Sequence, residues 1–222
     1  MNTLLYLIAL ILVFWAQYKV NGAYARYRNV ATRRGYRGFE VAKMILNKHG
    51  LYDVQVEMST GGQLSDHYDP KTNTVRLSKD IYYNDSIASV SVAAHEVGHA
   101  IQHATNYSMI ALRDKILPIA MISSQMGWTV LFIGLLFTMD FLFYLGVIML
   151  CVIALFQLIT LPVELDASKR ALAILSEEGI ILSEERHDCQ AMLSAAAFTY
   201  IASLIATVLQ ILRLLMVRRR RD

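Results

Sequence analysis

The sequence predicts a mostly helical membrane protein of the α+β class, with about four membrane-associated helices and one small domain that combines a short antiparallel sheet with a helix. Three observations predict this class. Hydrophobic residues make up 55% of the 222 positions, more than a soluble domain of this length needs. They gather in four long segments. The strand-like runs lie in a single polar stretch between the first two of these segments.

The first apolar segment, residues 3–18, predicts a transmembrane anchor within residues 1–18. It contains no charged residue and ends in aromatic side chains that suit a membrane interface. A cleaved signal peptide is the alternative. Such a peptide carries basic residues before its apolar core, whereas here the basic residues follow the core, so we interpret the segment as an uncleaved anchor.

The remaining apolar segments predict a helical hairpin and a C-terminal membrane helix. Residues 116–139 and 141–161 are separated only by Asp140, so the stretch 116–161 is long enough to cross a bilayer twice. Residues 191–217 are rich in the small side chains that let membrane helices pack closely. With the four arginines that follow, residues 191–222 are predicted to form a membrane helix and a basic tail.

Two polar stretches, residues 19–115 and 162–190, are separated by two predicted spans and therefore face the same side of the membrane. The basic run at 19–38 predicts that this side is the cytoplasm. The arginines at 218–221 disagree, since a fourth span would place them outside. The last segment is then tilted, re-entrant or interfacial, or the orientation is inverted; the simplest interpretation of the arginines is a solvated tail.

Turn and cap residues divide the first polar stretch into elements. The spacing of apolar residues predicts a helix over 39–50 that ends at Gly50. Runs at 54–58, 63–69 and 74–78 predict a small antiparallel sheet. Asp85 and Ser86 can cap a helix that begins near Ile87 and continues past His103.

The second polar stretch predicts a helix over 163–179, ended by Gly179, and a further helix capped by Ser183 that leads into the last apolar segment.

The helix predicted after Ser86 carries the sequence AAHEVGHAIQHA at 93–104. His95 and His99 are four residues apart, so both can direct a ring nitrogen at one metal ion from the same helix face. Glu96 is not needed as a ligand, but it can take a proton from water activated at the metal and pass it to a leaving amine. Gly98 allows close backbone approach. The alternative is a helix whose two histidines are satisfied by ordinary packing and hydrogen bonds.

A catalytic zinc site usually has a third protein ligand in addition to two histidines. His103 lies about 12 Å along the helix from His95, too far to share one ion. Gln102 and Thr105 stand where the longer three-histidine motif has glycine and histidine, which excludes that class. Glu164 and Asp166 follow the hairpin on the same membrane side, and they are either metal ligands or ordinary anions at the start of a helix.

These residues resemble the gluzincin membrane proteases and, more closely, the bacterial neutral zinc metallopeptidases of the YugP-like group. The resemblance covers nearly the whole chain and rests on DHYDP at 66–70, VRLS at 75–78, the motif at 93–104, LPVELDAS at 161–168 and AAAFTY at 195–200. It implies His95, His99 and Glu164 as zinc ligands and Glu96 as the general base. Ser168 replaces an aspartate that often follows in gluzincins, and Asp166 is the candidate to supply its hydrogen bond.

Other positions give weaker predictions. The hairpin at 65–78 offers an edge strand that can pair with an extended substrate. Four side chains could stabilise the oxyanion, with packing or interfacial roles as the alternative for each: His67, Tyr68, His187 and Tyr200.

We therefore expect a membrane-bound zinc metalloendopeptidase in the bacterial cell membrane, with its active site at the cytoplasmic surface and unfolded or membrane-associated chains as substrates. Membrane protein quality control follows by analogy only. Intramembrane proteolysis is disfavoured because polar residues flank the motif helix. The alternative from another class is a zinc-clamped scaffold or chaperone without catalysis, which would not need Glu96.

The distribution of basic residues argues against nucleic acid as a partner, and the two cysteines form no disulfide or zinc-thiolate pattern.

Overall fold

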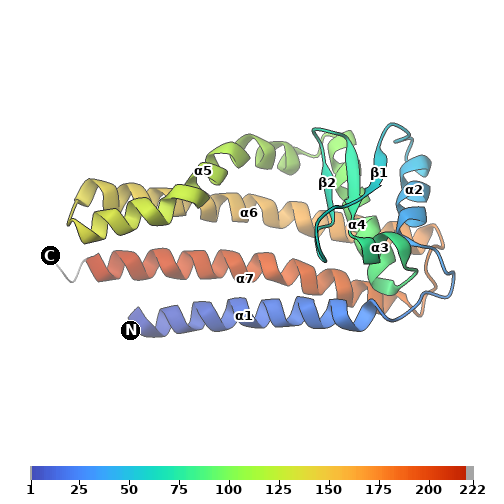
Figure 1. Ribbon diagram of the computed structural model, residues 1–222, viewed down its shortest axis with the longest axis horizontal. Coiled ribbons are helices and arrows are strands. Elements are labelled where there is room, and N and C mark those ends of the chain that lie inside the picture. The colour runs from blue at the N-terminus through green and yellow to red at the C-terminus, as the bar shows by residue number, and fades with distance from the viewer. Residues whose placement is uncertain (1, 219–222) are drawn as a thin grey trace. The chain divides into compact units, whose positions relative to one another are not determined.

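The computed structural model describes residues 2–218, so the predicted tail arginines at 219–221 lie outside the described residues. The chain is mostly helical, as predicted (Figure 1). The elements in chain order are α1 (Asn2–Tyr27), α2 (Gly38–Lys48), β1 (Gln55–Met58), β2 (His67–Asp69), β3 (Thr74–Leu77), α3 (Lys79–Tyr83), α4 (Ile87–Ala104), α5 (Ser108–Leu136), α6 (Asp140–Glu177) and α7 (Arg186–Arg218).

The chain divides into two compact units. The first, here called the sheet unit, contains residues 18–107 and 163–197. The second, the helical unit, contains the described residues of 1–17, 108–162 and 198–222. The two polar stretches, which the hairpin separates in sequence, thus supply one compact unit. The three long helices α1, α6 and α7 each continue from one unit into the other.

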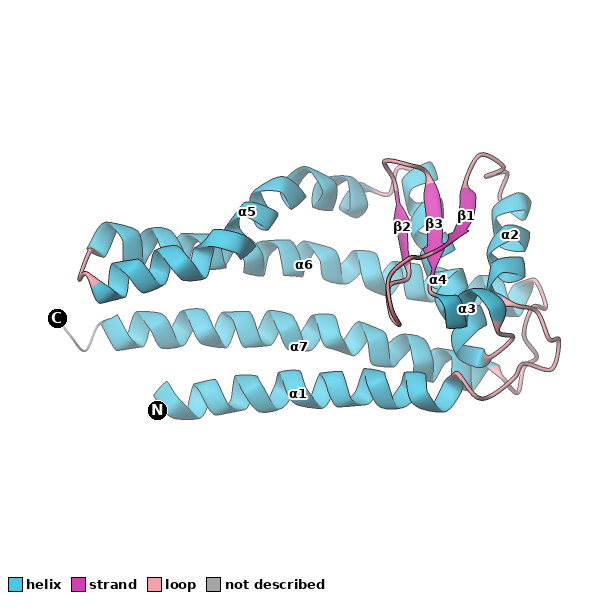
Figure 2. Ribbon diagram, viewed as in Figure 1, coloured by secondary structure: helices cyan, strands magenta, loops and turns pink. Residues whose placement is uncertain are grey.

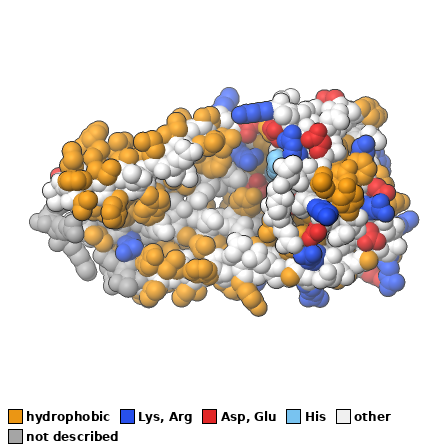
Figure 3. Space-filling view, in the orientation of Figure 1, with side chains coloured by type: hydrophobic (Ala, Val, Ile, Leu, Met, Phe, Trp, Pro, Cys, Tyr) orange, Lys and Arg blue, Asp and Glu red, His pale blue; other side chains and the backbone are white. Residues whose placement is uncertain are grey.

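The helical unit carries the membrane character of the protein. Four helices, α1, α5, α6 and α7, are long and apolar enough to cross a membrane. Hydrophobic side chains cover much of the visible surface of α5 and α6, whereas charged side chains gather on the sheet unit (Figure 3). The protein is therefore a membrane protein with a polar, folded sheet unit.

The hairpin of α5 and α6 is tightly packed. A β-carbon added at Gly134 would lie 2.4 Å from the backbone nitrogen of Phe143, and one at Gly146 would lie 2.6 Å from Cβ of Leu131. Near the turn, Asp140 forms an ion pair with Arg218 at the end of α7. This pair brings the end of α7 to the hairpin turn, which favours a last helix that runs the full length of the unit.

The helix expected to begin at residue 163 is instead the continuation of the third apolar segment. Helix α6 runs without interruption from Asp140 to Glu177 and includes Pro162. Proline removes one backbone hydrogen bond, but membrane helices tolerate it when neighbouring groups satisfy the freed carbonyl groups. The sequence predicted an apolar segment that ends at residue 161 and a separate helix over 163–179, and the local sequence alone did not reveal that the two are one helix.

The sheet has three strands in the order β1-β3-β2 (Figure 2). Strands β2 and β3 form the expected antiparallel hairpin, with Tyr68 opposite Val75. The prediction of a wholly antiparallel sheet was wrong, because β1 pairs with β3 in parallel. Strands β1 and β2 lie on opposite sides of β3. The connection through residues 59–66 carries the chain from one side to the other, and β1 and β3 run in the same direction. Strand β2 begins at His67, later than the predicted run at 63–69, and Leu64 before it has a φ of 60°.

Helix α4 forms the centre of the sheet unit and begins and ends as predicted. Its N-cap is Ser86, whose hydroxyl accepts a hydrogen bond from the Ser89 backbone at 3.1 Å. Val90 and Val97 on this helix are fully buried in the core with Val41 and Val75, from α2 and β3. The histidine-bearing helix is thus fixed along most of its length by apolar packing.

Helix α7 begins later than the sequence suggested, at Arg186 instead of just after Ser183. The buried carboxylate of Glu185 accepts hydrogen bonds from the backbone of Leu182 at 2.7 Å and of Arg33 at 2.6 Å. Glu185 therefore ties the turn before α7 to the loop after α1.

Candidate metal centre and active site

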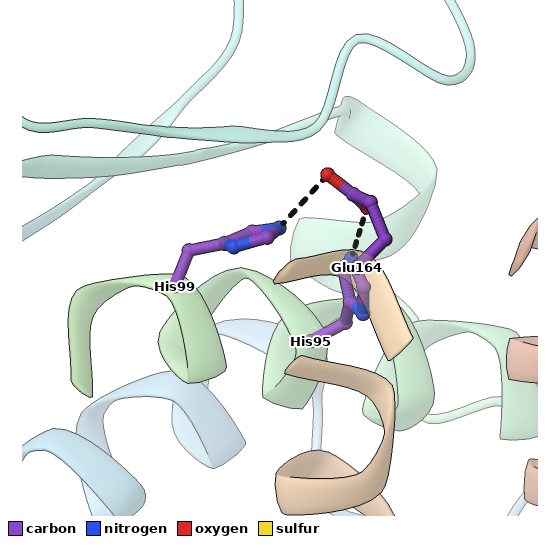
Figure 4. Close-up of side chains that lie close together, drawn as sticks. All are labelled: His95, His99 and Glu164. Carbon is purple, nitrogen blue, oxygen red and sulfur yellow. Dashed lines mark ion pairs between the residues drawn. The ribbon is translucent and has the colours of Figure 1, made fainter. Parts of the chain in front are cut away.

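The structure brings together the three predicted metal ligands. α4 presents His95 and His99 on one face, and α6 supplies Glu164 opposite them (Figure 4). Nε2 of His95 lies 3.4 Å from Oε2 of Glu164, and Nε2 of His99 lies 3.7 Å from Oε1 of the same carboxylate. One possible ligand atom from each residue lies within 4.8 Å of the others. All three residues belong to the sheet unit.

The chemistry of this cluster fits a zinc ion. Two imidazoles and one carboxylate are a common ligand set for catalytic zinc, which keeps a fourth position open. Glu164 is 5% exposed and His99 8% exposed, so both are largely removed from water. Burial lowers the pKa of His95, but its bond to Glu164 and the charges of Glu96 and Glu164 raise that pKa by more. The site thus favours a positive charge, either a proton or a metal cation, between His95 and Glu164.

The outer nitrogen of each histidine ring also has a partner. Nδ1 of His95 lies 3.2 Å from the hydroxyl of Ser168, and Nδ1 of His99 lies 3.0 Å from Oε1 of Gln102. Ser168, which stands where gluzincins often have an aspartate, is thus the residue that contacts the outer nitrogen of His95. Asp166 does not supply that bond in the structure; it accepts hydrogen bonds from Gln102 and Arg170.

Gly98 allows α4 and α6 to approach at the level of the cluster. A β-carbon at this position would lie 3.0 Å from the backbone oxygen of Ala167 and 3.4 Å from its Cα. Because these are backbone atoms of a helix, they cannot move aside alone. Gly98 therefore sets the separation between the two histidines and Glu164.

We expect Gly98→Ala to force α4 away from α6, lowering zinc affinity and reducing stability by about 1–3 kcal/mol, the usual cost of overpacking a core. Zinc titration and the thermal unfolding midpoint in detergent measure these effects. Gly62→Ala is the matched control, since a β-carbon there meets nothing within 4 Å. Equal zinc affinity in the two variants would contradict this role of Gly98.

Glu96 follows His95 on the same helix and is 8% exposed. Burial raises its pKa to about 7 from an ordinary value of 4.5; the charge of His95 opposes this rise, and the charges of Asp66 and Glu164 add to it. The backbone amide of Tyr68, on the edge strand β2, donates a hydrogen bond to Glu96. A carboxylate with a pKa near the working pH can both accept and release a proton, as a general base must.

The raised pKa predicts how Glu96 affects the stability of the metal-free protein. Below pH 4.5 the folded and unfolded states both hold the proton, so Glu96 costs little. Between about pH 4.5 and 7 the unfolded chain ionises while the buried group keeps its proton, so the folded state loses stability, and the loss reaches about 3 kcal/mol above pH 7. Glu96→Gln should therefore raise the thermal unfolding midpoint at pH 8 and change it little at pH 4.5. The exposed Glu184→Gln is the control; a difference independent of pH would contradict the prediction.

The structure accounts for the four candidate oxyanion stabilisers separately. The hydroxyl of Tyr68 donates to Asn73 at 2.8 Å, and its ring lies 5.4 Å from that of His103. His67 is exposed, and its Nδ1 lies 2.8 Å from the backbone oxygen of Ser65. The side chain of His187 is 90% exposed. Tyr200 belongs to the helical unit. Tyr68 also lies next to Glu96, because its backbone amide donates a hydrogen bond to that carboxylate.

Two residues near the cluster were not expected from the sequence. Gln102 was noted only because it excludes the longer histidine motif, yet it is completely buried and contacts His99. Asp66 accepts hydrogen bonds from the backbone of Ser78 at 2.6 Å and from its hydroxyl at 3.1 Å, and its charge acts on Glu96. The spacing of His99 and Gln102, one helical turn apart, was the available signal for Gln102.

Comparison with known proteins agrees with this chemistry. The profile of the family described as "Putative neutral zinc metallopeptidase" matches residues 2–219. A protein of Bacillus subtilis (strain 168) named "Putative membrane protease YugP" is 44% identical over 209 residues, which cover 94% of this chain and 92% of that protein. No solved structure matches the chain.

Proposed function

Because the chain belongs to the family of putative neutral zinc metallopeptidases, we propose that it is a membrane-bound zinc metalloendopeptidase, with His95, His99 and Glu164 as ligands and Glu96 as general base. The observation that carries the proposal is the convergence of the two histidines and Glu164 beside a buried glutamate. A structural zinc site needs no such glutamate and usually closes its fourth position, so the arrangement favours catalysis over a zinc-clamped scaffold.

The chemistry divides between the metal and the chain. Zinc, when bound, acts as a Lewis acid and lowers the pKa of water to about 7. Glu96 takes the proton from the attacking water at its carboxylate and then transfers it to the nitrogen of the leaving amine. Ser168 and Gln102 hold the outer nitrogens of the two histidines, so that both Nε2 atoms remain directed at Glu164.

The edge strand β2 is the proposed place for the substrate backbone. One edge of β2 pairs with β3, so an extended substrate would pair along the opposite edge. Tyr68 on this strand already contacts Glu96, which puts the edge next to the general base. An extended backbone is available in unfolded or membrane-associated chains, and such proteins are the proposed substrates, in membrane protein quality control. The basic residues at 19–38 support a cytoplasmic orientation of the site.

A combined measurement of zinc content and cleavage tests the proposal. Detergent-purified protein should contain one zinc per chain by elemental analysis and should cleave β-casein, an unfolded chain. Removal of zinc with a chelator should stop cleavage, and added zinc should restore it. Bound zinc without cleavage of β-casein, or of a mixed library of unstructured peptides, would favour the scaffold. A protein without zinc would overturn the proposal.

A further inference from the structure

A buried amide links the candidate metal centre to the helix that carries its third ligand. Gln102 lies on α4, three residues after His99, and is completely buried. Its Oε1 lies 3.0 Å from Nδ1 of His99. Its Nε2 donates two hydrogen bonds of 2.8 Å to α6, one to the backbone oxygen of Val163 and one to Oδ2 of Asp166.

These partners fix the direction of every hydrogen bond in the group. The Val163 carbonyl and the Asp166 carboxylate can only accept, so the amide nitrogen of Gln102 must face them. The atom that remains for His99 is the amide oxygen, which can also only accept. Nδ1 of His99 must therefore carry the proton. In the neutral ring this leaves the lone pair on Nε2, the atom that faces Glu164.

The position of the two acceptors gives Gln102 a second effect. Val163 directly precedes Glu164, and Asp166 follows it by two residues. One side chain thus holds the ring of His99 and, on both sides of Glu164, the segment that presents the opposing carboxylate. The relative positions of these two ligands depend on this amide.

Asp166 is itself held in place. Nε of Arg170, one turn further along α6, donates to Oδ2 of Asp166 at 2.5 Å. The guanidinium of Arg170 lies 5.9 Å from the centre of the Tyr107 ring and is partly exposed. The chain of contacts therefore runs from a partly exposed arginine, through Asp166 and Gln102, to His99.

His95 is held differently. Its outer nitrogen meets the hydroxyl of Ser168, which can either donate or accept a hydrogen bond. Ser168 therefore does not select one tautomer of His95, whereas Gln102 does so for His99.

We propose that Gln102 is a positioning residue for the metal centre: it fixes the tautomer and orientation of His99 and holds them in register with Glu164, and Asp166 and Arg170 orient its amide. This inference rests on the proposed zinc site. Partners of this kind usually change metal affinity by about 10- to 100-fold.

Zinc affinity, measured by competition with a chromogenic chelator on the detergent-purified full chain, tests the proposal. Gln102→Met keeps the size of the side chain and removes its hydrogen bonds, and it should weaken zinc binding by about 10- to 100-fold. Asp166→Ala should weaken it by a smaller factor. Lys169→Ala, an exposed neighbour with a positive charge, is the control and should bind zinc like the wild type.

Two readouts separate positioning from a general loss of structure. If Asp166 acts through Gln102, the double variant should bind zinc no more weakly than Gln102→Met alone, whereas independent effects would multiply. The visible spectrum of the cobalt-substituted protein should change in Gln102→Met, because the ligand geometry changes. The thermal unfolding midpoints of the metal-free variants report on the fold.

Each outcome of the zinc-binding test either supports or overturns the proposed role of Gln102. A wild type that binds zinc, with a Gln102→Met variant of equal affinity and unchanged cobalt spectrum, would overturn the role of Gln102 and leave the zinc site intact. A wild type without zinc would overturn the zinc site itself. Should Gln102→Met fail to fold, Asp166→Ala carries the test, since this residue lies one hydrogen bond further from His99 and is partly exposed; unchanged affinity there would count against the proposal.

Discussion

Replacing Glu96 by glutamine is expected to lower the rate of peptide cleavage by about 10²- to 10⁴-fold, the usual contribution of a general base. Glutamine has nearly the same size and can still accept the backbone hydrogen bond from Tyr68. It cannot take a proton from water. Because His95, His99 and Glu164 are unchanged, the variant should still bind one zinc per chain. Cleavage of β-casein and zinc content, measured on the same preparation, check both parts of the expectation.

The exposed Glu184→Gln makes the same chemical change away from the cluster and should cleave at the wild-type rate. A Glu96→Gln variant that keeps most of its activity would remove Glu96 from the mechanism and require another base. Loss of zinc together with activity would instead mean that Glu96 supports the ligand set.

Glu164→Ala is expected to lose zinc. The substitution removes the carboxylate whose two oxygens face His95 and His99, and it leaves the two histidines with one fewer ligand. Affinity should fall by more than about a hundredfold, beyond the range of residues that only support a ligand. Elemental analysis after dialysis against a weak chelator should therefore find close to one zinc per wild-type chain and almost none in this variant.

Asp166→Ala is the matched control, because it removes a carboxylate two residues away on the same helix. It should still hold one zinc at saturating metal, although more weakly if Gln102 acts as proposed. Zinc retained by Glu164→Ala but lost from Asp166→Ala would exchange the assignments of these two acids.

The features that depend on nearby residues could be predicted from the sequence. Helix α4 was expected from Ile87 past His103 because Asp85 and Ser86 can cap its start, and Ser86 does so in the structure. The four apolar segments are visible in composition alone and correspond to the four candidate spans. The spacing of His95 and His99 predicts a shared face, because four residues make about one helical turn.

The features that depend on contacts between distant parts of the chain could not be predicted from the sequence. Strand β2 pairs with one side of β3, so β1 pairs with the other side and runs parallel to β3. The alternation of residues along a strand does not show which side of a neighbour it will join. Local reasoning also began a separate helix at residue 163, within what is one continuous helix, α6. Gln102 gains its importance from Val163 and Asp166, more than sixty residues later, so its own neighbours in sequence did not reveal it.

The two histidines and Glu164 come from parts of the sequence that are separated by α5 and by the part of α6 that precedes Glu164. A zinc ion bound by all three would act as a cross-link between those parts, and its binding energy would add to the stability of the fold. Metal supply would then govern the lifetime of the protein as well as its activity.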